Sequence, residues 1–215
     1  MLDPTDYIIT RKRKKYKFAL FANSPLCFEY DQWDKGASVD TIEIGAGTGL
    51  FSVALADSSP HQKFLAVDVK ADRLQTGARL AEEKGLTNIR FLRARADQLP
   101  ELLAPSSLAS IWLTFPDPFP KKRSAGRRLT HPTFLAQYQE LLSAGGALYL
   151  KHDNRDFFLW SLEQLVASGW QINELSFDLH ESTLSDEYKI MTTYEKRWTS
   201  EGFTTNFVAA KPPRT

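Results

Sequence analysis

From residue 39 onward, short apolar runs alternate with segments of helical periodicity, and this alternation is the feature that most constrains the fold. Strands are predicted at residues 39–44, 63–69, 88–95, 110–115, 147–151, 172–179 and 206–211. Helices are predicted at residues 50–57, 71–84, 132–143 and 156–168, and glycines follow the last three of them as stop signals. Because strands separated by helices pair in parallel, the sequence predicts a doubly wound α/β domain over residues 39–215.

Residues 1–38 lack this alternation and are basic and aromatic, which predicts an irregular N-terminal arm that packs on the domain or on a partner. The single cysteine, Cys27, excludes a disulfide framework and a multi-cysteine zinc site, and we interpret it as a buried or inert thiol. No apolar run approaches the roughly 20 residues that a membrane span needs, and no secretory signal opens the sequence. These features predict a cytoplasmic protein without a metal or a membrane partner.

The charge of the chain is unevenly distributed. The formal net charge is +1, but residues 11–17 carry six cations and residues 121–128 carry five, with no acid in either run. The remaining 200 residues therefore carry a net charge of −10. Phosphate binding depends on local positive potential and not on total charge, so the two runs are candidates for contact with a polyanion. A solvated surface is the alternative for the first run.

The first predicted strand runs into a glycine loop, Glu43-Ile44-Gly45-Ala46-Gly47-Thr48-Gly49. A dinucleotide-binding loop would place glycine or alanine at residue 50, which is leucine here, so a nicotinamide dehydrogenase is disfavoured. The acid followed by three alternating glycines resembles motif I of the class I S-adenosylmethionine (SAM) methyltransferases. Glu43 suits the cationic sulfonium and ammonium of SAM, and Gly45, Gly47 and Gly49 let a ligand approach bare backbone.

Two further acids follow the next two predicted strands. Asp68 ends the second strand, where a carboxylate can accept the ribose hydroxyls, and Asp97 follows the third, where it can accept the adenine amino group. A lone aspartate is usually a solvated or capping residue. Three acids at successive strand ends favour a SAM site instead, because ligands of parallel sheets bind at that edge.

The fourth predicted strand is followed by Phe115-Pro116-Asp117-Pro118-Phe119-Pro120 and then by the second basic run. The prolines on both sides hold Asp117 in a stiff, extended loop. In a class I methyltransferase, this position presents the group that is methylated. A proline-stiffened connector is the structural alternative.

This loop, continued through Lys121-Lys122-Arg123 and Arg127-Arg128-Leu129, resembles the signature of the bacterial tRNA (guanine-N7)-methyltransferases, the TrmB family. The resemblance continues through Lys151-His152-Asp153-Asn154 and Thr192-Thr193-Tyr194-Glu195, and it covers about residues 39–210. It implies a Rossmann-like fold with a mostly parallel seven-stranded sheet, helices on both faces and an antiparallel last strand. It also implies methyl transfer from SAM to N7 of guanosine 46 in the variable loop of tRNA.

The resemblance also implies roles for individual residues. SAM contacts are implied for Glu43, Asp68, Asp97 and Asp117, with Asp117 as the catalytic candidate. Contacts with the substrate are implied for Lys121, Asp153, Thr192, Thr193, Tyr194 and Glu195, and a core position is the alternative for Glu195. RNA contacts are implied for Arg123, Arg127 and Arg128, and expected for the N-terminal run Arg11, Lys12, Arg13, Lys14 and Lys15.

The chain departs from the family pattern at two positions. Phe119 replaces the usual tryptophan and keeps an aromatic face for stacking. His152 replaces a common threonine, and we interpret it as a core or loop histidine, with an effect on pH dependence as the alternative. The competing functions are a class I methyltransferase acting on another nucleobase position and a non-catalytic RNA-binding module. The oligomeric state stays open between monomer and homodimer.

Overall fold

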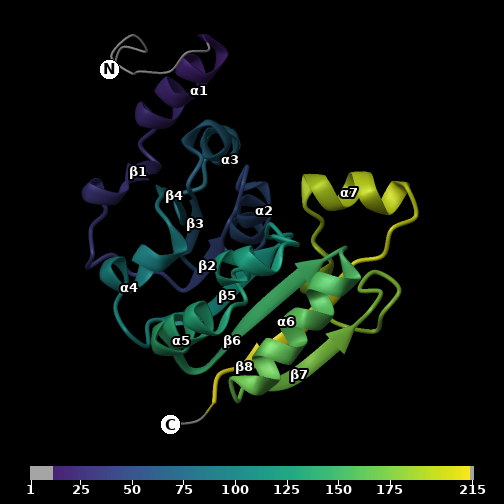
Figure 1. Cartoon of the computed structure of the whole chain (residues 1–215). Coiled ribbons are helices and arrows are strands. Elements are labelled where there is room, and N and C mark those ends of the chain that lie inside the picture. Colours follow the sequence, from purple (N-terminus) through teal and green to yellow (C-terminus); the bar gives the residue numbers. More distant parts are fainter. Residues whose placement is uncertain (1–11, 214–215) are drawn as a thin grey trace.

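The computed structural model describes residues 12–213. Figure 1 shows its arrangement. The strands are β1 Cys27–Glu29, β2 Thr41–Ile44, β3 Phe64–Asp68, β4 Ile89–Arg93, β5 Leu108–Thr114, β6 Leu142–His152, β7 Gln171–Ser176 and β8 Asn206–Lys211. The α-helices are α1 Lys12–Ala22, α2 Leu50–Ser58, α3 Ala71–Glu83, α4 Leu99–Leu102, α5 Pro132–Leu141, α6 Arg155–Ala167 and α7 Thr193–Ser200. Short 3₁₀ helices are η2 Tyr30–Gln32, η3 Ala96–Gln98, η4 Lys122–Arg127 and η5 Asp186–Lys189.

Within the described residues, the strands form one sheet in the order β1-β4-β3-β2-β5-β6-β8-β7. The last strand, β8, runs antiparallel to β6 and to β7, and the other paired strands run parallel. From β2, the strand numbers rise toward β3 and β4 on one side and toward β5 and β6 on the other, so the strand order reverses at β2. The predicted Rossmann-like fold with an antiparallel last strand is confirmed, and the sheet has eight strands where seven were predicted.

The eighth strand lies in the segment that was predicted to be an irregular arm packing on the domain or on a partner. Its described part does pack on the domain, but it is not irregular, because it forms α1 and β1. Strand β1 pairs in parallel with β4 at the sheet edge, and α1 packs on α3. Phe21 is 1% exposed, and the indole N–H of Trp33 donates to the carbonyl of Leu102 at 3.1 Å. Cations occupy the first turns of α1 and apolar residues the rest, so the helix shows no amphipathic period in the sequence.

The core has two layers, one on each face of the sheet. Phe21, Phe51 and Leu74 from α1, α2 and α3 belong to the layer on one face. Helices α4, α5 and α6 contribute to the layer on the other face, and Figure 1 shows α6 lying across β6 and β7. Cys27 is buried in the first layer, and burial raises the pKa of its thiol to about 12, as expected for an inert cysteine.

The sheet places the carboxyl ends of β2, β3, β4, β5 and β6 along one edge. Strand β6 begins at Leu142, five residues before its predicted start, and continues to His152. Helix α7 and η5 occupy the polar stretch between β7 and β8, and α7 stands above the same edge (Figure 1). In residues 12–213, no helix is both long and apolar enough to cross a membrane.

Candidate active site

The glycine loop between β2 and α2 is held in a conformation that only glycine adopts without strain. Gly45, Gly47 and Gly49 have φ values of 77°, 56° and 69°. A Cβ on Gly49 would lie 2.7 Å from the Phe91 ring, so this glycine is also required by packing. A Cβ on Gly47 would meet nothing within 4 Å, because the backbone there faces an open cavity.

Asp68, at the end of β3, fixes this loop. Its Oδ2 accepts a hydrogen bond from the backbone N–H of Gly47 at 2.9 Å, and its Oδ1 accepts one from the backbone N–H of Lys70 at 2.8 Å. Each carboxylate oxygen keeps a second lone pair for another donor. Asp68 therefore shapes the loop and also offers an acceptor to the cavity that it lines.

Glu43 lies beneath the loop and is 2% exposed. Its Oε2 accepts from the hydroxyl of Ser52 at 2.5 Å and from the Ser52 N–H at 3.2 Å, and its Oε1 accepts from the hydroxyl of Thr114. Burial raises the pKa of this carboxyl to about 7, although the hydrogen bonds oppose the shift. Glu43 thus joins β2, α2 and β5 directly below the cavity.

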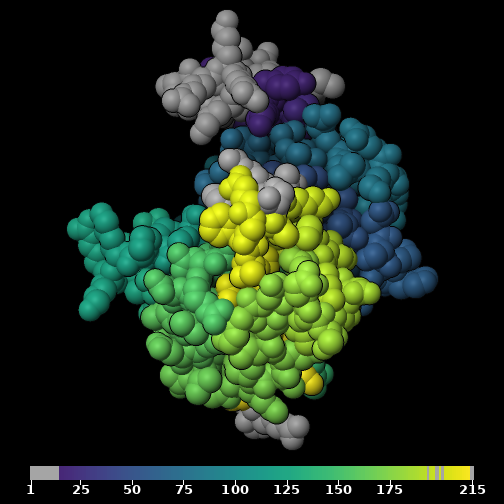
Figure 2. Space-filling model, turned by 90° about the vertical axis from the view of Figure 1, so that its right-hand side faces the viewer, coloured from purple at the N-terminus to yellow at the C-terminus, as the bar shows by residue number. Residues whose placement is uncertain are grey.

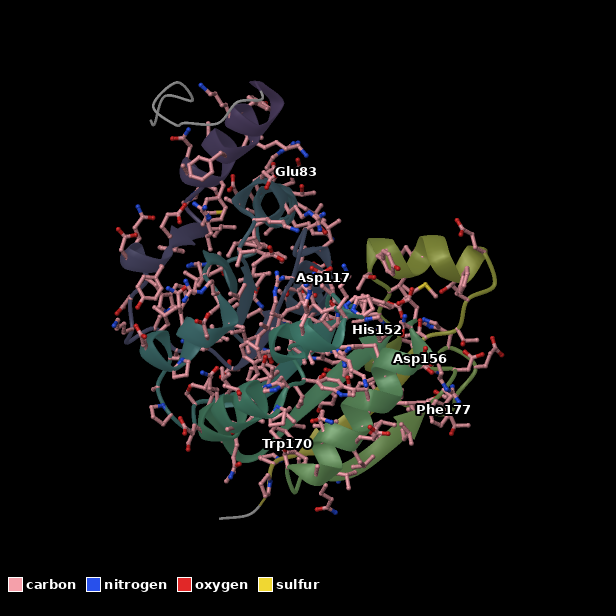
Figure 3. The ribbon with its side chains drawn as sticks, viewed as in Figure 1. Glu83, Asp117, His152, Asp156, Trp170 and Phe177 are labelled. Carbon is pink, nitrogen blue, oxygen red and sulfur yellow. The ribbon has the colours of Figure 1, made fainter. Side chains whose placement is uncertain are left out.

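Two adjoining cavities lie along the carboxyl edge of the sheet. One, of about 430 Å³, extends from the glycine loop to the residues that follow β6 and precede α7. The other, of about 260 Å³, lies between the ends of β3 and β4 and the loop after β5. Asp117 lines both cavities, and Figure 3 shows it near His152 at the centre of the molecule. Any ligand that spans the two cavities passes Asp117.

The loop that carries Asp117 has an unusual backbone. Phe115 and Phe119 have φ values of 50° and 39°, a region that non-glycine residues rarely adopt and that costs free energy. The Phe115 N–H donates to the carbonyl of Lys151 at 2.9 Å. The Arg128 guanidinium donates to the carbonyls of Pro118 at 3.0 Å and Phe119 at 3.1 Å. These bonds hold the loop in its strained form.

Arg128 makes its contacts within the protein. Its guanidinium donates to backbone carbonyls of the Asp117 loop and stacks on Trp160, with Cζ 4.2 Å from the ring centroid. These contacts give Arg128 a structural role that the sequence did not predict, and its contact with RNA stays a prediction.

His152 holds the same loop from the other side. Its Nε2–H donates to the carbonyl of Pro116 at 2.9 Å, because a carbonyl oxygen can only accept. Its Nδ1 lies 2.8 Å from the backbone nitrogen of Asn154 and 3.1 Å from Asp153 Oδ1. The ring is 3% exposed and packs against Phe157 with centroids 4.5 Å apart. The interpretation of His152 as a core or loop histidine agrees with this position, and the bond to Pro116 adds a positioning role.

The Thr192–Glu195 segment begins α7 with a capping box. The hydroxyl of Thr192 accepts from the Glu195 N–H at 2.9 Å, and Glu195 Oε2 accepts from the Thr192 N–H at 3.0 Å. Thr192 and Tyr194 line the larger cavity, and the Tyr194 hydroxyl donates to Asp153 at 2.9 Å. The Thr-x-x-Glu spacing is itself a capping signal that the sequence reasoning did not use.

Glu195 is a correction to the sequence prediction, because its side chain is fully buried and does not line the cavity. Its Oε1 lies 2.8 Å from His180 Nε2, and its Oε2 lies 3.5 Å from Lys151 Nζ. Burial acts to raise the pKa of this carboxyl, but the hydrogen bond from His180 and the charge of Lys151 outweigh it, so the pKa lies below its usual range. Glu195 anchors α7 to the body where a substrate contact was predicted.

Lys151 was not singled out as a site residue, and it is the most unusual charge in the structure. The residue is 0% exposed, and its Nζ donates to the carbonyl of Ile190 at 2.7 Å and lies 5.1 Å from the centroid of Phe51. Burial lowers the pKa of this ammonium, and Glu195 opposes the shift. A lysine on a buried strand is rare. The position of Lys151 in the apolar run of β6 is therefore the sequence signal from which its unusual role could have been predicted.

The other predicted residues are distributed as follows. Asp153 lines the larger cavity beside Asp117, whereas the exposed Asp97 pairs with Arg95 at 2.8 Å and lines neither cavity. Lys121 and Arg123 are exposed and line neither cavity. Lys121 directly precedes η4 and Arg123 lies in it, and this segment stands out from the body in Figure 2 (teal). Lys15 is half-buried on α1. The predictions for Arg11 and for the side chains of Lys12, Arg13, Lys14 and Thr193 lie outside the described residues.

Within the described part, no cluster of three or more metal-ligating side chains occurs.

Comparison with solved structures supports the fold. The chain is similar to a crystal structure of the 16S rRNA methyltransferase KamB, with a TM-score of 0.62 at 16% identity over 86% of this chain and 90% of that one. It is also similar to a 16S rRNA (adenine(1408)-N(1))-methyltransferase from Catenulisporales acidiphilia, with a TM-score of 0.56 at 14% identity over 100% and 93% of the two chains. The order of the strands and the glycine loop at the carboxyl ends of the strands therefore identify the fold as that of a class I methyltransferase.

Sequence comparison places the chain more narrowly. Residues 37–207 match the family described as "Putative methyltransferase". The tRNA (guanine-N(7)-)-methyltransferase of Brevibacillus brevis is 37% identical over 86% of this chain and 87% of its own length. The protein of that name from Lachnoclostridium phytofermentans is 42% identical over 75% of each chain. The chain belongs to the tRNA (guanine-N7)-methyltransferase family.

Proposed function

We propose that this protein transfers a methyl group from SAM to N7 of a guanosine in tRNA, at position 46 of the variable loop. The observation that carries the proposal is that Asp117 lines both cavities, at the junction between the smaller cavity, which would hold the adenosine of the cofactor, and the larger one, which would hold its methionine end and the base. The reaction would take place in the cytoplasm, with the protein as a monomer or a homodimer.

The residues present fit SAM. The smaller cavity offers Asp68 to the ribose hydroxyls and an apolar floor of Val67 and Ala94 to the adenine. The larger cavity offers the bare backbone at Gly47 and the carboxyl of Glu43 to the methionine end and its ammonium. SAM supplies an electrophilic methyl group on a sulfonium, and its sulfur leaves as a neutral thioether.

Guanine N7 carries an in-plane lone pair and no proton, so the transfer needs no general base. Asp117 and Asp153 stand at the outer part of the larger cavity and can accept from guanine N1–H and the 2-amino group, which adenine does not offer. Their negative charge also stabilises the positive charge that develops on the base. Burial acts to raise the pKa of Asp153, but the contacts with His152 and Tyr194 outweigh it, so its pKa lies below the usual range and it is ionised at neutral pH. The chain thus acts mainly by positioning.

Binding of tRNA would use the exposed cations of the η4 segment. Lys121, Arg123 and Arg127 are exposed next to the Asp117 loop, where they can contact phosphates around a splayed base. Because such contacts release counterions, tRNA affinity should fall as salt rises.

The decisive experiment is incubation of the protein with methyl-labelled SAM and unmodified total tRNA, followed by nucleoside and position mapping. We expect labelled 7-methylguanosine at position 46. A methylated exocyclic amine or another position would identify a different nucleobase methyltransferase, and RNA binding without SAM binding would identify a non-catalytic module.

A further inference from the structure

The smaller cavity is covered by a pair of side chains from the loop after β5. The guanidinium carbon of Arg127 lies 4.4 Å from the centroid of the Phe119 ring, and both residues line this cavity together with Asp68 and Leu129. Phe119 does not line the larger cavity, so its ring faces the cofactor end of the site. The sequence predicted an aromatic face for stacking at this position, without naming its partner.

The position of Phe119 is built into the loop. Its φ of 39° is a strained conformation for a phenylalanine, and the hydrogen bond from Arg128 to its carbonyl at 3.1 Å helps to hold it there. Arg128 is itself anchored on Trp160 of α6. The aromatic ring is therefore presented to the cavity by a defined framework.

Arg127 has a second surface available for a ligand. The flat face of its guanidinium lies on Phe119, and its side chain donates no hydrogen bond within residues 12–213. A guanidinium can stack through its face while it donates to a phosphate through its edge. Arg127 ends η4, so its edge belongs to the same exposed basic segment as Arg123.

We propose that the Phe119–Arg127 pair closes over the adenine of SAM and couples cofactor binding to tRNA binding. This proposal rests on the proposed function. A tRNA phosphate bound to the edge of Arg127 would fix its face on Phe119 and so close the adenine site. The coupling must be reciprocal, because each ligand changes the affinity of the other by the same factor.

The test is calorimetric titration of S-adenosylhomocysteine into the full chain, alone and with saturating unmodified tRNA, so that no turnover occurs. In the natural protein we expect tRNA to tighten this binding about fivefold or more. Arg127→Ala should weaken binding without tRNA about two- to fivefold and abolish the enhancement, because the stacked cation is lost. Phe119→Leu, which keeps an apolar side chain, should have the same two effects.

Arg123→Ala is the matched control, since it removes an exposed cation of the same segment that lines neither cavity. It should weaken tRNA binding but leave the enhancement intact at saturating tRNA. Equal affinity for S-adenosylhomocysteine with and without tRNA in the natural protein would overturn the coupling, as would an unchanged enhancement in Arg127→Ala. Failure of the proposed function would look different, since the natural protein would then bind no S-adenosylhomocysteine or form no 7-methylguanosine.

Discussion

The Nε2–H of His152 donates to the carbonyl of Pro116 at 2.9 Å, and this bond ties the end of β6 to the loop that carries Asp117. The two carboxylates assigned to the guanine, Asp117 and Asp153, lie on the two segments that this bond joins. Their relative position is therefore set by a buried imidazole.

His152→Ala should lower kcat about 10- to 100-fold, because a small misplacement of reacting groups is costly when catalysis is by positioning. The affinity for S-adenosylhomocysteine should change much less than kcat, since His152 lines only the larger cavity and not the smaller one assigned to the adenosine. Steady-state kinetics with tRNA and calorimetry measure the two quantities. His61→Ala, at an exposed position, serves as the control, and an unchanged kcat in His152→Ala would contradict the positioning role.

Asp117→Ala should reduce kcat/KM for tRNA methylation by about 100-fold or more, the effect of removing one group that stabilises developing charge. Asp117 is exposed, so the melting temperature should stay close to that of the natural protein. Asp156→Ala, an exposed acid in the first turn of α6, is the control and should keep its activity. Full turnover by a folded Asp117→Ala variant would remove Asp117 from the mechanism.

The protein without ligand should lose stability as the pH rises through about 7, because folding raises the pKa of Glu43 to about 7. The folded state binds this proton more tightly than the unfolded state, so the stabilisation is fully present below the ordinary carboxyl range and is lost above about pH 7. Relative to Glu43→Gln, the natural protein should lose roughly 3 kcal/mol of unfolding free energy between pH 4 and pH 8. Urea denaturation at both pH values measures this difference, and parallel pH profiles for the two proteins would refute the assignment.

Glu195→Ala should destabilise the protein by about 3–5 kcal/mol, because it leaves Lys151 buried without its carboxylate partner. It also removes one half of the capping box with Thr192. Thermal denaturation measures the loss, and Glu163→Ala, at an exposed position on α6, should change stability by less than about 0.5 kcal/mol. Loss of activity with an unchanged melting temperature would instead favour a direct substrate contact.

The sequence predicted the doubly wound sheet and the glycine-loop edge because these depend on local signals. Apolar runs of strand length, glycines with positive φ and acids at strand ends can each be recognised from adjacent residues. Phe21 was missed as a core residue and β1 was missed as a strand, since the first depends on contact with α3 and the second on pairing with β4, which are both distant in the chain. Because α1 begins with a basic run, its sequence shows no apolar pattern from which such contacts could be predicted.

The sequence by itself determined the class of the protein and the residue types of its site, through the order of strands and helices and the motif blocks. Only the tertiary structure decided which side chains reach the cavities. Asp117 lines both, whereas Glu195, three residues after the cavity-lining Thr192, turns inward to Lys151 and His180. Arg127 stacks on Phe119, while its neighbour Arg128 turns back to hold the loop. The physical reason is that neighbouring side chains point in different directions. The role of each side chain depends on the residues it meets, and the fold brings these from elsewhere in the chain.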